Sequence, residues 1–341
     1  MLLFPKQSLA VVCASLLTAC GGSSSSDTDP TPTPTPQAAV MSLAVSDAPV
    51  EDVHEVVVCF TAIELKSDSV DNVDIIIGES ETAEPTNTLC VDDNDDLIPN
   101  TKGIDLLSVT GVDAEPLFTD LELPAGTYNQ LRLVMGDGSY ATLDLDQDGV
   151  ADDSDADGVA DKVPLRVPSN ELKLDGFTLA QGQVFNATVE FDLRKAMTNP
   201  VGQDGYILKP RGVRLVDNAE IGHIEGTVSE ALLLNSECPV MPQDLTTAVA
   251  SVYAYAGTGH ELTDLADNGG SEAVESLTSS AVLYDGATSY DFTLSYLPAG
   301  DYTLALTCDE DADPEGDDDV MFLTAITATV EADGTTEVVI E

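Results

Sequence analysis

The sequence predicts an all-β protein in which two antiparallel β-sandwich domains follow one another. Apolar and polar residues alternate over residues 184–193, and this period of two gives a strand one buried and one exposed face. Similar short apolar segments are separated by turn residues, and no long segment has the apolar spacing of an amphipathic helix. Hydrophobic residues make up 43% of the 341 residues, which is enough to form a core despite a net charge of −50.

The first 19 residues have the pattern of an export signal. An apolar run from Leu9 to Leu17 is too short to span a membrane and leads into Leu17-Thr-Ala-Cys20. This pattern resembles a bacterial lipoprotein signal with its lipobox, which implies cleavage before Cys20 and a lipid anchor on that cysteine. Gly21 implies, by the same resemblance, sorting to the outer membrane of the cell envelope. An ordinary secretory signal with an incidental cysteine is the alternative.

Residues 20–37 are expected to form a tether between the lipidated Cys20 and the first domain. The tether begins with Gly and Ser, which make a chain flexible, and continues with alternating Pro and Thr, which favour an extended conformation. The first domain is predicted over residues 38–217 and the second over 218–341, because Asp, Asn and Gly cluster at 217–222. The expected strands include 56–65, 131–135 and 184–193 in the first domain, and 224–228, 248–255, 289–296, 301–308, 321–331 and 337–341 in the second.

One segment of the first domain recurs in the second. Residues 118–128 end in Leu-Pro-Ala-Gly-Thr-Tyr, and residues 292–302 end in Leu-Pro-Ala-Gly-Asp-Tyr. We interpret each copy as a strand, a tight turn, and a second strand whose tyrosine packs near the turn. The two domains are therefore expected to have related topologies.

Four cysteines are expected to form two disulfides in an oxidising compartment. Of the six cysteines, Cys13 leaves with the signal and Cys20 carries lipid, which leaves an even number. Two of the four lie in each predicted domain, so we predict the bridges Cys59–Cys90 and Cys238–Cys308. The other two pairings would cross-link the domains.

Several stretches of the chain are similar to known families. In the first domain they are Met41–Pro49, Val56–Leu65, Leu123–Tyr128 with Leu131–Leu133, Phe191–Lys195 and Leu208–Val216. Together they resemble the bacterial lipoprotein family called domain of unknown function 4382, which implies an exported β-rich domain and no known activity. In the second domain, Gly222–Val228 and Leu297–Tyr302 resemble the transthyretin-like or carboxypeptidase-regulatory-like sandwich. Such modules mostly act as spacers, adhesin stalks or binding domains.

Residues 144–161 contain two consecutive copies of an Asp-rich loop with the pattern D-x-D-x-D-G, starting at Asp144 and Asp153. Ca²⁺ binds about six to eight oxygens, which alternate carboxylates, a glycine turn and a carbonyl can supply. The pattern resembles the calcium loops of thrombospondin type 3 repeats and, in its first half, of EF-hands. The predicted Ca²⁺ ligands are Asp144, Asp146, Asp148, Asp152, Asp153, Asp155, Asp157 and Asp161, with the backbone carbonyls of Val150 and Val159. Pro164 takes the closing position of the second copy, which is therefore incomplete. A solvated acidic loop is the alternative.

The remaining polar motifs do not indicate catalysis. The acidic runs 92–96 and 309–319 lack the calcium-loop spacing and are interpreted as solvated loops. His54, His223 and His260 stand in no zinc-binding motif, and the sequence has no G-x-S-x-G nucleophile motif. We therefore predict no enzyme activity. A net charge of −50 also excludes nucleic acid as a partner, because phosphates repel such a chain.

We expect a non-catalytic, membrane-anchored, calcium-binding lipoprotein that acts in surface binding, adhesion or envelope assembly. Its partners would be the membrane, through the lipid on Cys20, and a protein or a surface polymer. Two alternatives stay open. A hydrolase of extracellular polymers would need a pocket with converging His, Ser or paired carboxylates. A subunit that accepts a partner's strand would need a long, unpaired, apolar sheet edge.

Overall fold

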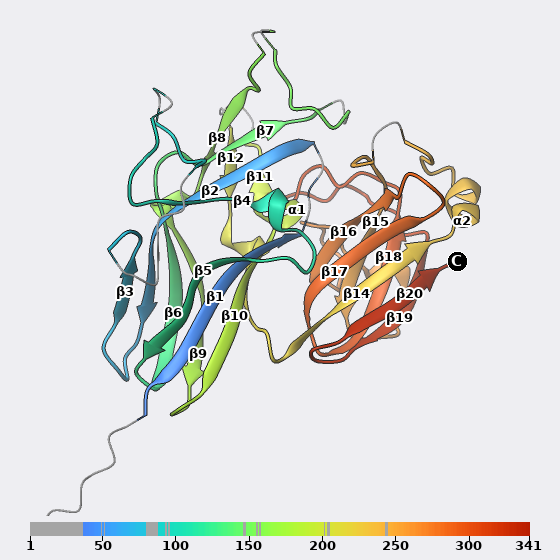
Figure 1. The fold of residues 1–341 in the computed structure, drawn as a ribbon. Helices are drawn as coiled ribbons and strands as arrows, with labels where there is room; N and C mark the ends of the chain where they lie inside the picture. Colours follow the sequence, from blue (N-terminus) through green and yellow to red (C-terminus); the bar gives the residue numbers. More distant parts are fainter. Residues whose placement is uncertain are drawn as a thin grey trace, which may run out of the picture. The chain divides into compact units, whose positions relative to one another are not determined.

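The computed structural model describes residues 37–48, 50, 52–79, 88–92, 94, 96–145, 148–154, 156, 158–200, 202, 205–242 and 245–341. Nearly all of its regular structure is β, which confirms the all-β prediction (Figure 1). Residues 36–341 form one compact unit. The predicted signal peptide, Cys20 and the tether up to residue 36 lie outside the described residues. In the described part of the chain, no helix is both long and apolar enough to cross a membrane.

Two sheets of the first part of the chain form a β-sandwich. Their strands are β1 (Ala39–Ala48), β2 (Val53–Lys66), β3 (Val73–Ile76), β4 (Lys102–Asp105), β5 (Glu115–Leu123), β6 (Gly126–Met135), β7 (Tyr140–Leu143), β8 (Lys162–Arg166), β9 (Glu171–Leu179), β10 (Val184–Asp192), β11 (Met197–Thr198), β12 (Tyr206–Leu208) and β13 (Val213–Asp217). One sheet has the order β13-β10-β1-β5 and the other β11-β12-β8-β7-β2-β6-β9, with β3 and β4 also paired to β2. Leu43 of β1, Phe60 of β2 and Leu133 of β6 belong to one continuous core, so the two sheets pack face to face.

Strand β2 is buried on both faces. Val58 and Phe60 point into the core of the sandwich, whereas Cys59 packs on the opposite face with Cys90 and Tyr140. The predicted disulfide Cys59–Cys90 is present and fixes the covering loop to the strand. Because both faces of the strand are covered, all five residues 56–60 are buried, although successive side chains point to opposite faces.

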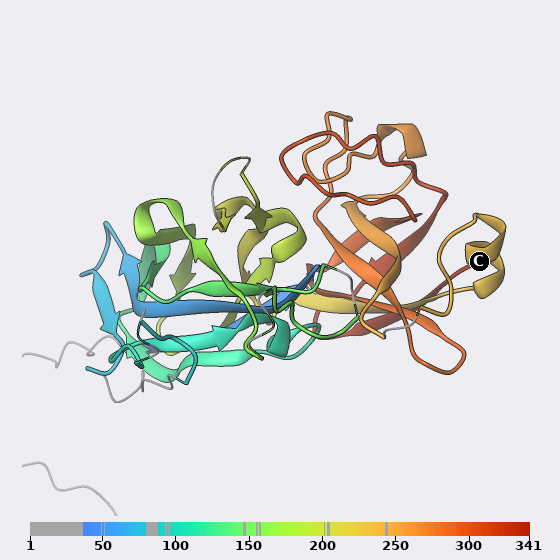
Figure 2. The same cartoon turned by 90° about the horizontal axis from the view of Figure 1, so that it is seen from above.

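A third sheet contains the remaining strands. They are β14 (Ile221–Val228), β15 (Ala248–Ala256), β16 (Thr278–Tyr284), β17 (Tyr290–Pro298), β18 (Gly300–Thr307), β19 (Thr324–Val330) and β20 (Thr335–Ile340), in the order β19-β18-β15-β16-β17-β14-β20. The sheet curls around its own core, and its two end strands meet where Thr336 Oγ1 donates to the carbonyl of Thr329 at 2.7 Å (Figure 2). The second predicted disulfide, Cys238–Cys308, lies at the border of this core.

Short helices occupy the connections. They are η1 (Leu106–Val109), η2 (Pro168–Asn170), α1 (Leu193–Ala196), η3 (Pro210–Gly212), α2 (Glu230–Asn235) and η4 (Leu262–Asp264). Helix α1 and the residue before it connect the first sandwich to the third sheet. Asp192 accepts a hydrogen bond from Thr278 Oγ1 at 2.8 Å, and Arg194 donates to Ser251 Oγ at 2.6 Å. These bonds hold one end of β10 against β15 and β16.

Three strand pairs are parallel, which departs from the prediction of antiparallel sheets. The parallel pairs are β1–β10, β8–β12 and β14–β20. Parallel neighbours need a long connection, and Val40 of β1 pairs with Val184 of β10. Because apolar periodicity reports the burial of a strand and not its direction, the sequence could not indicate this pairing.

The repeated Leu-Pro-Ala-Gly segments adopt the same local arrangement. The hydroxyl of Tyr128 donates to the carbonyl of Pro124 at 3.0 Å, and that of Tyr302 donates to the carbonyl of Pro298 at 2.7 Å. Both tyrosines are buried. Each bond ties a strand to the turn that precedes it, as the sequence comparison of the two segments predicts.

Strand β15 carries large side chains on both faces. Val252 points into the core of the third sheet, whereas Tyr253 and Tyr255 point outward and pack with Leu265 and Phe322. Leu265 belongs to the connection between β15 and β16, and Phe322 to that between β18 and β19. These two connections therefore cover the outer face of β15, where they come close together (Figure 2).

Candidate cation sites

The Asp-rich segment 144–161 connects β7 and β8, which are antiparallel neighbours with Tyr140 opposite Pro164. The backbone N–H of Asp152 donates to the carbonyl of Leu143 at 2.8 Å. Nine residues later, the N–H of Asp161 donates to the carbonyl of Asp152 at 2.9 Å. The same backbone hydrogen bond therefore occurs twice in the segment, nine residues apart, which is also the spacing of the two copies of the sequence motif.

Side-chain hydrogen bonds repeat with the same period. The N–H of Leu145 donates to Oδ2 of Asp152 at 3.2 Å, and the N–H of Ser154 donates to Oδ2 of Asp161 at 2.8 Å. Each bond joins the second position of a loop to its ninth. The bonds from Ser154 lower the pKa of the Asp161 carboxyl, because they favour its charged form.

The first and sixth positions of each loop are also connected. The N–H of Gly149 donates to Oδ2 of Asp144 at 3.0 Å, and that of Gly158 donates to Oδ2 of Asp153 at 2.7 Å. Both glycines have positive φ, +80° and +90°, a conformation that other residues adopt only with strain. The glycine of the motif thus permits the turn that brings its N–H to the first aspartate.

The predicted ligands are only partly placed by the structure. Asp146, Asp155 and Asp157 lie outside the described residues. Asp144 is 6% exposed. The side chains of Val150 and Val159 face solvent, which is compatible with their predicted role, because only their backbone carbonyls would bind the ion. In the described part of 144–161, no three acidic side chains bring their oxygens within 4.8 Å of one another. Calcium coordination by this segment stays a prediction.

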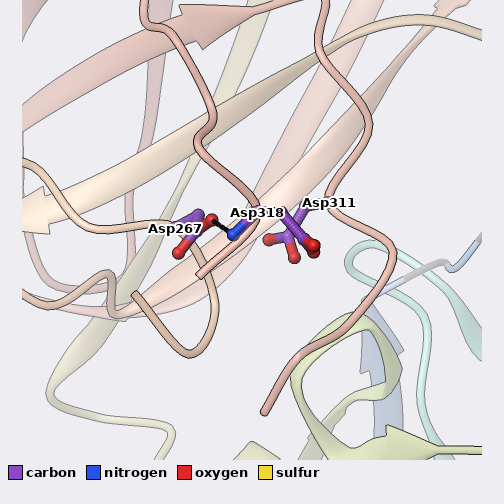
Figure 3. A group of neighbouring side chains, drawn as sticks. All are labelled: Asp267, Asp311 and Asp318. Carbon is purple, nitrogen blue, oxygen red and sulfur yellow. Dashed lines mark hydrogen bonds between the residues drawn. The ribbon is translucent and has the colours of Figure 1, made fainter. Parts of the chain in front are cut away.

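A second group of carboxylates lies over the outer face of β15. One oxygen each of Asp267, Asp311 and Asp318 lie within 4.8 Å of one another (Figure 3). The same holds for Asp267, Glu272 and Asp317. We call these five residues the β15 acidic cluster. Asp311, Asp317 and Asp318 belong to the acidic run 309–319, for which the sequence predicts a solvated loop. The structure corrects this in part, because Asp311 and Asp318 are partly buried.

Burial and mutual repulsion act on the cluster. Burial raises the pKa of Asp267, and the nearby carboxylates of Asp311, Asp317 and Asp318 raise it further. Burial also raises the pKa of Asp311, where the guanidinium of Arg194 and a hydrogen bond from a tyrosine partly oppose the effect. One indirect signal of this group is present in the sequence, the density of acids in 309–319, but no local pattern connects that run to residue 267.

A cavity of about 550 Å³ opens beside the cluster, where α1 faces the connection between β18 and β19. Arg194, Ser251 and Asp311 are among its lining residues, and no histidine lines it among the described residues. Two of the three histidines, His223 and His260, make local contacts elsewhere: the ring of His223 packs edge-on against Tyr296. His260 Nε2 lies 2.9 Å from the carbonyl of Ala256. The described residues therefore offer the hydrolase alternative no histidine at this cavity.

A family model called domain of unknown function, DUF4382, matches residues 38–210 of the chain, about half its length. The chain belongs to the DUF4382 family. The DUF4382 match covers β1 to β12 and ends just before β13, the strand that completes the four-stranded sheet beside β10. The third sheet follows the matched residues.

Solved structures similar to this DUF4382 protein are distant. A leucine-rich repeat protein from Bacteroides thetaiotaomicron aligns with TM-score 0.21 and 12% identity over 89% of this chain and 26% of its own, so this chain spans about a quarter of that protein. A minor pilin of Streptococcus agalactiae aligns with TM-score 0.18 and 12% identity over 88% and 94% of the two chains. A putative cell adhesion protein from Bacteroides fragilis aligns with TM-score 0.21 and 10% identity over 89% of this chain and 92% of its own. TM-scores of this size do not identify a common fold, so no functional argument rests on them. No curated protein sequence matches the chain.

The DUF4382 domain also buries a set of acids near its opening Ser-Asp-Ala-Pro motif. Asp47 of that motif pairs across the β1–β10 ladder beside Glu190 and Asp192. Burial raises the pKa of all three carboxyls, and their mutual repulsion adds to the effect at Asp47 and Glu190. Arg214 forms an ion pair with Glu190, and Thr278 donates to Asp192.

Proposed function

We propose that the protein is a non-catalytic, lipid-anchored, calcium-binding lipoprotein of the cell envelope that acts in surface binding, adhesion or envelope assembly. The observation that carries the calcium part is the repetition of three hydrogen bonds, nine residues apart, in the two Asp-rich loops. Such a repeat supports two equivalent turns. Hard oxygen donors in this arrangement suit Ca²⁺.

The first loop would hold an ion through Asp144, Asp146, Asp148, Asp152 and Asp155, with the carbonyl of Val150. The second would use Asp153, Asp155, Asp157 and Asp161, with the carbonyl of Val159. Eight carboxylates in this short segment repel one another without a cation, so Ca²⁺ would stabilise the segment and, through β7 and β8, the sandwich.

Calorimetric titration and thermal unfolding of the full chain in detergent test the calcium proposal. With a Kd of about 10⁻⁴–10⁻³ M, about 10 mM Ca²⁺ should stabilise the protein by about 1.4–2.7 kcal/mol. That corresponds to a rise in melting temperature of a few degrees. The double variant Asp146→Ala, Asp148→Ala should lose the ion bound by the first loop and therefore bind fewer Ca²⁺ ions. The control Asp71→Ala, Glu79→Ala removes two exposed acids outside the loops and should retain it. Equal binding by both double variants would exclude the first loop as a site.

The lipobox supports the anchor at Cys20, and the Pro/Thr-rich tether supports a domain held away from the lipid surface. The partner is proposed to be a protein or a surface polymer, bound without chemical conversion. Labelling with a radioactive fatty acid should mark the natural chain and not a Cys20→Ser variant. Fractionation should then place the labelled chain in the outer membrane, and recovery of unlabelled natural chain in the soluble fraction would contradict the anchor.

A further inference from the structure

We propose that the β15 acidic cluster is a second divalent-cation site, in which Asp267, Asp311 and Asp318 hold a hard cation of the Ca²⁺ class with Glu272 and Asp317 beside them. This site is separate from the Asp-rich loops and does not depend on the proposed function. The five residues come from the two connections that cover the outer face of β15, so a bound cation would join these connections.

Hydrogen bonds hold one oxygen of each of the three carboxylates in place. Oδ2 of Asp267 accepts from the N–H of Asp318 at 2.8 Å (Figure 3). Oδ2 of Asp311 accepts from the N–H of Asn268 at 3.0 Å and from the hydroxyl of Tyr253 at 2.5 Å. Oδ2 of Asp318 accepts from the N–H of Asp313 at 2.7 Å. Hydrogen bonds that fix one oxygen and direct the other are what surrounding residues supply to carboxylate ligands of metals.

Buried carboxylate oxygens of the cluster have no hydrogen-bond partner among the described residues. Asp267 is 6% exposed, and among the described residues its Oδ1 has no hydrogen-bond partner. The same is true of Oδ1 of Asp311 and Oε2 of Glu272, both inaccessible to solvent. Buried charged oxygens are stable when they are paired, hydrogen-bonded or bound to a metal. The charges that act most strongly on Asp267 are those of neighbouring carboxylates, so a cation would satisfy it.

The backbone at Gly270 lies close to two of the unpartnered oxygens. A Cβ atom there would lie 2.2 Å from Oδ1 of Asp267 and 2.7 Å from Oε2 of Glu272. The absence of a side chain therefore keeps these two unpartnered oxygens beside each other. Gly269, with φ of +98°, brings the same turn against the backbone of Gly316 in the acidic run. The turn thus fits closely around the cluster.

Terbium luminescence tests the site directly, because Tb³⁺ replaces Ca²⁺ and is excited by a nearby tyrosine. The chain has no Trp, and the hydroxyl of Tyr253 contacts Asp311. The experiment uses the full chain with Asp146→Ala and Asp148→Ala, so that the first Asp-rich loop does not contribute. We expect saturable Tb³⁺ emission that Ca²⁺ displaces, at least about tenfold weaker binding in Asp267→Asn, and unchanged binding in the nearby control Asp264→Asn. Tyr253→Phe should reduce the emission while calorimetry still detects Ca²⁺.

Thermal unfolding separates a ligand from a structural residue. In chelator, Asp267→Asn should melt at the same temperature as its parent or higher, because the change removes an unpartnered buried charge. In millimolar Ca²⁺ the order should reverse, since only the parent gains stability from the ion. A variant that melts lower than its parent by the same amount in both conditions would overturn the proposal. Equal Tb³⁺ and Ca²⁺ affinities of parent and Asp267→Asn would overturn it as well.

Discussion

The buried Glu190 makes a specific and unusual pH dependence testable. Its side chain is 2% exposed on β10 and forms an ion pair with Arg214. Burial raises the pKa of Glu190 from 4.5 to about 7, and the charge of Asp192 adds to this, while Arg214 opposes it. In the unfolded chain the carboxyl has its ordinary pKa, so the folded protein holds a proton that the unfolded chain releases.

The sign and size follow from this difference. Between pH 4.5 and about 7 the folded state binds more protons at this site than the unfolded state, so the free energy of unfolding falls as the pH rises. The stabilising contribution is complete below pH 4.5 and is lost above about pH 7. The two pKa values differ by an amount equivalent to about 3 kcal/mol. Ion-paired surface carboxylates have the opposite effect, because an ion pair lowers the pKa of the carboxyl and its contribution to the free energy of unfolding is lost as the pH falls.

Urea unfolding at pH 4.5, 6 and 7.5 in chelator measures this contribution in natural protein and in Glu190→Gln, which is neutral at every pH. Relative to the variant, the natural protein should lose about 3 kcal/mol across this range. The exposed Glu220→Gln controls for the loss of one carboxylate from the net charge. Parallel stability curves for natural protein and Glu190→Gln would refute the reasoning. A natural protein that gains stability relative to the variant would show that Arg214 dominates.

Three further predictions concern stability and the Asp-rich loops. Tyr128→Phe and Tyr302→Phe should each lower the free energy of unfolding by about 1 kcal/mol in urea, because each removes one buried hydroxyl's bond to a turn carbonyl. A neutral effect in both would contradict a stabilising role of these bonds, and an effect in only one would contradict the equivalence of the two turns. Replacing Cys238 and Cys308 by Ser should cost about 4 kcal/mol, because the bridge closes 70 residues. Reduction of a variant in which Cys59 and Cys90 are already replaced by Ser should give the same loss, because it then opens this bridge alone. Gly158→Ala should weaken calcium binding about fivefold by calorimetry. The φ angle of Gly158 is +90° and an added Cβ would meet no neighbour, so the substitution costs only about 1 kcal/mol of backbone strain. An unchanged affinity would show that the second loop does not take part.

Some features of the protein were predictable because they depend on residues close together in the chain. The alternation along residues 184–193 predicts the buried strand β10, because a strand's side chains alternate between faces wherever the strand pairs. The even number of cysteines and their distribution predict both disulfides. The repeated Leu-Pro-Ala-Gly segment predicts a tyrosine beside each turn, since turn geometry is set within a few residues.

Other features were decided only when distant segments met. The direction of pairing between β1 and β10 follows from the route of the chain between them, which no local pattern reports. Asp267 and Asp318 are 51 residues apart and meet because β15 pairs with both β16 and β18, which brings the two following connections over one face. The sequence by itself determined the composition of each strand and turn. Tertiary structure decided which acidic residues are buried together, because burial of a charge depends on every segment that surrounds it.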